Sequence, residues 1–123
     1  MEQRTLSFCK FIKHNESLVE AILDNSVDLG VDHANEVNNI LKSMFTVPYS
    51  ILVDVRNDFT FTFDAGVKIG NSELEKRVAL LIHRKSTETA ARCVIHMQKA
   101  SFPEKELKIF YDRDLAIKWL EEI

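Results

Sequence analysis

Short apolar runs alternate along the chain with segments whose apolar residues recur at helical spacing. The runs with the length and composition of strands cover residues 5–13, 18–23, 49–55, 78–82 and 107–111. Those at 49–55 and 78–82 are apolar at nearly every position, which is typical of strands covered on both faces in a parallel sheet. The run at 5–13 alternates instead, and a short polar turn separates it from 18–23. This spacing predicts an antiparallel hairpin over residues 5–23 at one edge of the sheet.

Four helices are predicted between and after these strands. Their expected N-terminal caps are Asp32, Thr62, Ser86 or Thr87, and Asp112, because a side-chain oxygen at that position accepts from free backbone N–H groups. The second helix is short, over residues 63–69, and a capping-box sequence at 72–75 predicts one further turn. The residues expected to face the core are Ala34, Val37, Ile40, Leu41, Met44, Ala90, Ala91, Val94, Ile95, Leu115, Ala116, Trp119, Leu120 and Ile123.

The order of these elements is β-β-α-β-α-β-α-β-α. Strands that alternate with helices predict an α/β fold with a mostly parallel sheet, whose first strand is an antiparallel edge. The sequence contains no repeat, linker or low-complexity tract, so residues 1–123 are expected to form one domain.

The composition argues against several classes of function, such as nucleic-acid binding. The net charge is −3 and no basic stripe is present, so nucleic acid is not an expected partner. No apolar run approaches the roughly 20 residues of a membrane span, and no signal peptide is recognised at the start. Cys9 and Cys93 lack metal-ligand spacing and are interpreted as reduced packing residues. We therefore expect a cytoplasmic protein.

Three segments resemble one known family. They are YSILVDVRN at 49–57, VALLIH at 78–83, and the ending LKIFYDRDLAIKWLEEI at 107–123. With the order of elements, they are similar to the STAS-like superfamily of sporulation anti-sigma-factor antagonists (SpoIIAA-like), and in particular to small bacterial proteins described as STAS/SEC14-like. The resemblance implies a single STAS-like domain that acts as a regulatory, non-catalytic protein-binding module.

The resemblance also implies a position for a phosphorylation switch. Phosphoregulated members carry a serine at the start of the second helix, and alignment on Asp54 places Asp64 near that position. The Asp-Ser-Ser-Gly pattern of those members is absent, and the nearest hydroxyls are Thr60 and Thr62. A phosphate at Thr62 would add negative charge at a helix N-terminus. The alternative is that Thr62 is only a cap.

The loop and helix at 56–69 form the expected surface for a partner or ligand. The residues of this surface are Arg56, Asn57, Asp58, Phe59, Phe61, Thr62, Phe63 and Asp64. Loops at the carboxyl ends of parallel strands are where ligands and partners bind in such sheets. Arg84 and Lys85 follow the next strand beside a helix N-terminus, which favours an anion. The alternative is that these loops are polar only because they are solvated.

No residue pattern predicts catalysis, a metal or a cofactor. The chain lacks a nucleophile elbow and a phosphate-binding glycine loop. Asp54 is interpreted as a strand-end carboxylate bonded to its loop. The histidines lie on separate elements without a zinc-ligand pattern, and they are His14, His33, His83 and His96.

Phe59, Phe61 and Phe63 alternate with threonines, which places their rings on one side of an extended segment. They either pin the loop to the core or form an apolar site. A flat exposed patch there would favour a protein partner, whereas a cavity under the second helix would favour a carrier or sensor of a small lipid-like or anionic ligand. An uncovered edge at 5–23 would also permit a homodimer, which light scattering would detect.

Overall fold

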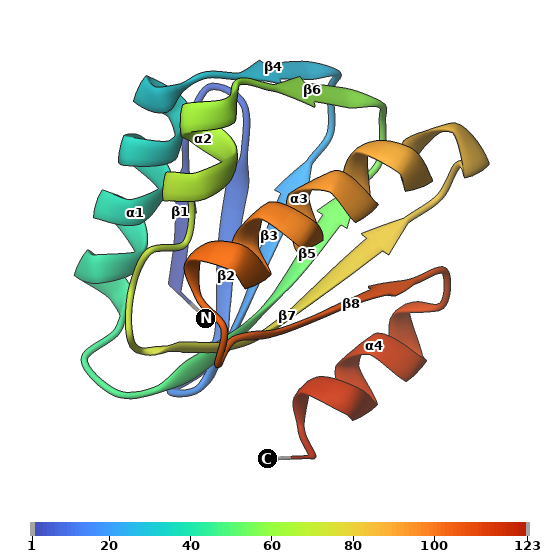
Figure 1. Ribbon diagram of the computed structural model, residues 1–123. Coiled ribbons are helices and arrows are strands. Elements are labelled where there is room, and N and C mark those ends of the chain that lie inside the picture. The colour runs from blue at the N-terminus through green and yellow to red at the C-terminus, as the bar shows by residue number, and fades with distance from the viewer. Residues whose placement is uncertain (1, 123) are drawn as a thin grey trace.

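A computed structural model describes residues 2–122 and shows within them a six-stranded mixed sheet with helices on both faces (Figure 1). The strands are β1 (Glu2–Thr5), β2 (Lys10–Asn15), β3 (Leu18–Leu23), β4 (Val27–Leu29), β5 (Tyr49–Val55), β6 (Phe59–Phe61), β7 (Glu75–Ile82) and β8 (Glu106–Phe110). The helices are α1 (Val31–Met44), α2 (Phe63–Lys68), α3 (Glu88–Ser101) and α4 (Arg113–Leu120), and a 3₁₀ turn at Lys85–Thr87 precedes α3.

The strand order is β1-β2-β3-β5-β7-β8. The pairs β3–β5, β5–β7 and β7–β8 are parallel, and the pairs β1–β2 and β2–β3 are antiparallel. This arrangement confirms the predicted α/β class with a mostly parallel sheet and an antiparallel edge. The strands β4 and β6 form a separate parallel pair. Each of them follows the carboxyl end of a central strand, so the pair lies above that edge of the sheet (Figure 1).

The sheet separates two apolar cores. Alternate side chains of β3, β5 and β7 point to opposite faces, as the pleat requires. On one face, Ile51 and Leu80 pack with Val37 of α1 in the larger core, which α2 and α3 also cover. On the other face, Leu52 and Leu81 pack against α4 in a smaller core. Both faces of β5 and β7 are therefore buried, which explains their nearly continuous apolar sequence.

The prediction of a single strand over residues 5–13 was wrong. The chain turns between β1 and β2, where the Leu6 N–H donates to the Cys9 carbonyl over 2.8 Å. Leu6 and Phe8 still pack against the larger core from within the turn, which gives the sequence a strand-like alternation. The hairpin of β2 and β3 is present, but the exposed strand β1 covers its outer side and forms the edge. The homodimer stays a prediction.

Two of the four predicted side-chain caps are present, and those predicted for α1 and α3 are not. Thr62 and Asp112 accept from the N–H groups of Ala65 and Leu115. Asp32 is not a cap, because α1 starts at Val31 and Asp32 already lies in its first turn. There the His33 ring accepts from the N–H of Gly30, which is the N-cap.

The turn at 72–75 does not become helical. The Ser72 hydroxyl accepts from the Leu74 N–H instead, and Glu75 begins β7. Thr87 occupies the N-cap position of α3, as one of the two predicted alternatives, but neither its hydroxyl nor that of Ser86 caps the helix, because both donate to the Asp58 carboxylate.

The predicted core stripes are correct for α1 and only partly correct for α3 and α4. Ala91 is buried on α3, and Ala116 and Leu120 are buried on α4. Leu115 was wrongly placed in the core, since it is 58% exposed. The predicted contribution of Ile123 lies outside the described residues. The buried polar residue Gln98 continues the inner face of α3 and was not predicted.

Candidate functional site

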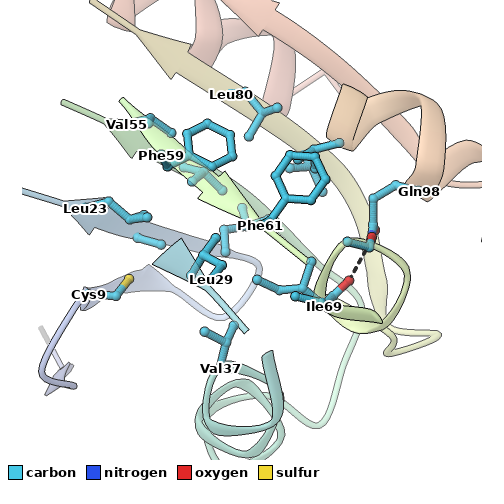
Figure 2. A pocket seen from close by; sticks show the side chains of 18 of the residues that line it. Cys9, Leu23, Leu29, Val37, Val55, Phe59, Phe61, Ile69, Leu80 and Gln98 are labelled. Atoms are coloured by element: carbon cyan, nitrogen blue, oxygen red, sulfur yellow. Dashed lines mark hydrogen bonds between the residues drawn. The ribbon is translucent and has the colours of Figure 1, made fainter. Parts of the chain in front are cut away.

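An apolar cavity of about 110 Å³ lies under α2, between the sheet, α1 and α3. Leu23 and Val55 reach it from the central strands, Val37 from α1, and Phe59 and Phe61 from β6 (Figure 2). An apolar lining with few polar groups is typical of small-molecule sites, and most such sites are larger, at about 300–1,000 Å³. The cavity is of the same order of size as engineered apolar cavities that bind benzene.

The three alternating phenylalanines lie in two different environments. Phe59 and Phe61 are half-buried and turn toward the cavity, where their ring centroids are 6.0 Å apart. Thr60 lies between them on the opposite side of β6 and is exposed. Phe63 begins α2 and is 71% exposed. Two of the three rings therefore form a wall of the cavity, and the third lies on the outer surface.

The C-terminal end of α2 is held by buried carboxamides from the two neighbouring helices. Asn38 of α1 donates to the Lys68 carbonyl over 2.9 Å and accepts from the Gly70 N–H over 2.8 Å. Gln98 of α3 donates to the carbonyls of Gly66 and Ile69 over 2.7 and 2.8 Å (Figure 2 draws its bond to Ile69). These bonds satisfy carbonyls that a helix end leaves without intrahelical partners. They fix α2 over the cavity.

A buried ion pair borders the cavity at the same end. Lys105 Nζ lies 2.7 Å from Glu75 Oε2, and both side chains are at least 96% buried, with exposed fractions of 3% and 4%. Lys105 also donates to the Gly70 carbonyl over 2.6 Å and to Gln98 Oε1 over 2.9 Å. Burial raises the pKa of the Glu75 carboxyl, and the Lys105 charge opposes this shift. Neither residue of this pair was predicted from the sequence as part of a site.

The predicted loop 56–58 is a hydrogen-bonded polar cluster whose Arg56 and Asp58 are exposed, and its role as a partner surface stays a prediction. Arg56 bridges Asp54 and Asp24, with N···O distances of 3.2 and 2.8 Å. His83 Nε2 lies 2.6 Å from Asp54 Oδ1. Asn57 donates to the Asp24 carbonyl. Asp54 is therefore a buried carboxylate at the end of its strand, but its partners are the side chains of Arg56 and His83 rather than the loop N–H groups that were predicted.

The expected anion site is adjacent to carboxylates of the chain itself. The Asp58 carboxylate accepts from Thr87 over 2.7 Å and from Ser86 over 2.9 Å, at the start of α3. These hydrogen bonds, that of Thr87 first, lower the pKa of the Asp58 carboxyl. Arg84 donates to Asn57, and Lys85 Nζ lies 3.3 Å from Glu88. Arg84 and Lys85 as a site for an external anion remain a prediction.

The two candidate phosphorylation sites are both exposed. Thr60 donates its hydroxyl to Asp28, on the neighbouring strand β4. The Thr62 hydroxyl accepts from the Ala65 N–H over 3.2 Å, and Asp64 follows in the first turn of α2. A phosphate on Thr62 would therefore alter the cap that begins α2. Phosphorylation at either residue stays a prediction.

A second buried carboxylate on the α4 face was not predicted. Glu20 of β3 lies 2.8 Å from an Arg113 guanidinium nitrogen and 2.9 Å from His14 Nε2. Burial raises the pKa of the Glu20 carboxyl, but the hydrogen bonds from Arg113 and His14 outweigh burial and leave this pKa lowered. This cluster holds the start of α4 to the sheet, because Arg113 is the first residue of that helix.

Within residues 2–122, no group of three or more metal-ligating side chains could hold a metal ion. His14 and His83 each contact a carboxylate, whereas His33 packs edge-on against Phe8 at a centroid distance of 4.7 Å. His96 is exposed on α3. Each histidine thus lies at a separate place in the fold.

The two cysteines are expected to differ strongly in reactivity. Burial raises the pKa of the Cys9 thiol to about 12, and Cys9 lines the cavity, while Cys93 is exposed. Because the thiolate is the nucleophile, Ellman's reagent at mild alkaline pH should label one thiol per chain quickly and the second at least ~100-fold more slowly. A Cys93→Ser variant identifies the fast thiol. Fast labelling of Cys9 in that variant would contradict the burial described here.

Comparison with known proteins places this architecture among SpoIIAA-like folds. A scan against protein-family models and a search of curated proteins found no match. Among solved structures, the chain is similar to an uncharacterised protein of the DUF3478 family from Shewanella loihica PV-4, described as having a SpoIIAA-like fold. The TM-score is 0.54 and the identity is 18%, over 91% of each chain. This likeness confirms the predicted STAS-like, SpoIIAA-like domain at the level of fold.

Among the helices described, none combines the length and apolar character needed to cross a membrane.

Proposed function

We propose that this domain is a non-catalytic binding module that takes a small apolar molecule into the cavity under α2. The cavity itself is the observation that carries this proposal, since it lies beneath the second helix and its lining is almost entirely apolar. Phe59 and Phe61 support a ligand more than a protein partner, because β6 turns them inward rather than onto the surface. The volume suits a molecule about the size of benzene rather than a long acyl chain.

Toluene is a suitable first probe, because it has seven non-hydrogen atoms and no polar group. We expect it to bind with a dissociation constant on the order of 1 mM, given the affinity that each atom of a small ligand contributes. Binding should shift the methyl NMR signals of cavity residues such as Val37, Val55 and Leu80. Signals from Leu52 and Leu81, on the other face of the sheet, should not move.

The matched variants are Ala65→Leu and Ala100→Leu. Ala65 lies in the cavity lining, so leucine there occupies part of the volume and should weaken toluene binding at least ~10-fold without a large loss of stability. Ala100 is exposed on α3, so the same substitution should leave toluene affinity unchanged. Equal affinity in both variants, or no binding by the unaltered protein, would contradict the proposal.

A protein partner on the outer face of α2 is the second candidate function. Phe63 favours it, because an aromatic side chain that is 71% exposed contributes little burial to this fold. Phe63→Asp should abolish a complex that the unaltered protein forms in extracts of its native host. The control is Leu115→Asp, because Leu115 is similarly exposed on α4, on the opposite face. Loss of the complex in both variants, or in neither, would argue against α2 as the partner surface.

A further inference from the structure

Among the polar groups that border the cavity, the strong donors are all hydrogen-bonded, whereas some acceptors can accept a further hydrogen bond. The polar side chains of the lining are Glu75, Gln98 and the Cys9 thiol. Glu75 and Gln98 lie together at the end of the cavity beneath the C-terminus of α2, since both bond to Lys105. A complete count of donors and acceptors at this end shows which ligand group it can accommodate.

The strong donors at this end are already used. Lys105 directs its three protons to Gly70, Glu75 and Gln98. Gln98 directs both amide protons to backbone carbonyls of α2 and its C-terminal cap. The backbone N–H groups of Gly66, Ile69 and Gly70 donate to Thr62, Ala65 and Asn38, in that order.

Acceptors, in contrast, have capacity left. The partner of Glu75 Oε1 is the Tyr49 hydroxyl at 3.4 Å, well beyond the 2.7–2.8 Å typical of O–H···O bonds. Glu75 is almost fully buried, so water does not complete this oxygen as it would at a surface. Gln98 Oε1 accepts one bond, from Lys105, and an amide oxygen can accept two.

We infer that the cavity selects a small apolar molecule that carries a single hydrogen-bond donor, such as a phenolic or alcoholic hydroxyl, directed at the Glu75 carboxylate. This inference rests on the proposed function and specifies the class of its ligand. A carboxylate or phosphate group does not fit, because it brings only acceptors and a charge that Glu75 repels. Of the lipid-like or anionic ligands that the sequence left open, we therefore do not expect an anionic one in this cavity.

The unaltered protein allows a direct test with four aromatic probes: toluene and phenol, which match in size, and the slightly larger anisole and benzoate. Phenol differs from toluene mainly by a hydroxyl in place of a methyl group. We expect phenol to bind at least ~10-fold more tightly than toluene and than anisole, which has an oxygen but no donor. Benzoate should show no saturable binding. A cavity without an accessible acceptor would give the reverse order of phenol and toluene, because dehydrating a hydroxyl without a new partner is unfavourable.

Tyr49→Phe provides a variant that is expected to fold, because it keeps the ring stacked on Phe45 at a centroid distance of 4.3 Å. It removes the hydroxyl that competes for Glu75 Oε1, so phenol affinity should be equal or up to ~3-fold higher, with toluene affinity unchanged. Glu75→Gln should reduce the advantage of phenol over toluene to less than ~3-fold.

The outcomes separate this inference from the function it rests on. Toluene binding that equals or exceeds phenol binding would overturn the donor preference and leave the apolar site in place. Weaker phenol binding by Tyr49→Phe would show that Tyr49, not Glu75, meets the hydroxyl. Absence of binding by both toluene and phenol would refute the proposed function as well.

Discussion

Replacing Lys105 with methionine should lower the free energy of unfolding by about 3–5 kcal/mol, because it leaves the Glu75 carboxylate buried without its cation. Methionine preserves most of the side-chain volume, so the loss reports charge and hydrogen bonding rather than a void. Three acceptors lose their donor at once, on Gly70, Glu75 and Gln98. Urea denaturation followed by the fluorescence of Trp119 measures the change.

The control for this variant is Lys99→Met, on the exposed side of α3, which should change stability by less than about 0.5 kcal/mol. The double variant Glu75→Leu with Lys105→Met should recover at least half of the loss, since it removes both charges. A double variant as unstable as the sum of the two single variants would show that the pair is not energetically coupled.

The loss in the free energy of unfolding caused by Lys105→Met should also depend on pH. Burial already raises the pKa of the Glu75 carboxyl, and removing Lys105 takes away the charge that opposes this shift. The folded variant therefore retains a proton on Glu75 at a pH where the unfolded chain has lost it. A carboxyl with a raised pKa destabilises the folded state fully above that pKa, and the penalty falls as the pH drops from there toward the ordinary pKa of the unfolded carboxyl. The loss of stability should therefore shrink as the pH is lowered toward about 4.3, the ordinary pKa of a glutamate, while the Lys99→Met difference stays flat.

The parts of the fold that were predicted correctly are those whose signal is local. The strand Tyr49–Val55 is delimited by Pro48 before it and by a polar loop after it, and the caps Thr62 and Asp112 need only three residues to act. The alternation at 5–13 was also local, but it was ambiguous. Apolar residues in a turn that folds onto the core have the same spacing as residues on one side of a strand.

The sequence indicated two side chains of the cavity wall but not the polar groups at its border. Phe59 and Phe61 were identified from their alternation, whereas the cavity they border depends on the volume left between four elements, which no pattern in the chain reports. Lys105 and Glu75 are 30 residues apart, and neither belongs to a motif. One signal was available: Glu75 begins β7 and Lys105 immediately precedes β8, and the starts of adjacent parallel strands lie at the same edge of a sheet.

Gly70→Ala should be the second large effect, with a loss of about 2–4 kcal/mol in the free energy of unfolding. Gly70 has a φ of +68°, in the left-handed region that costs an L-residue roughly 1–2 kcal/mol. A Cβ there would also lie 2.3 Å from Glu75 Oε2 and 3.1 Å from Lys105 Nζ. The substitution therefore strains the backbone and displaces the buried ion pair together.

Two matched substitutions separate the strain from the clash. Gly30→Ala should cost less than about 1 kcal/mol, because Gly30 has a φ of −101° and the nearest atom to a Cβ there is His33 Nδ1 at 3.7 Å. Gly70→Asn tolerates positive φ better than alanine but meets the same ion pair, so it should recover no more than about 1 kcal/mol of the loss. Full recovery by asparagine would assign the whole effect to the backbone. It would also mean that Glu75 can move aside at little cost, in which case its carboxylate could not fix the hydroxyl of a ligand in one position.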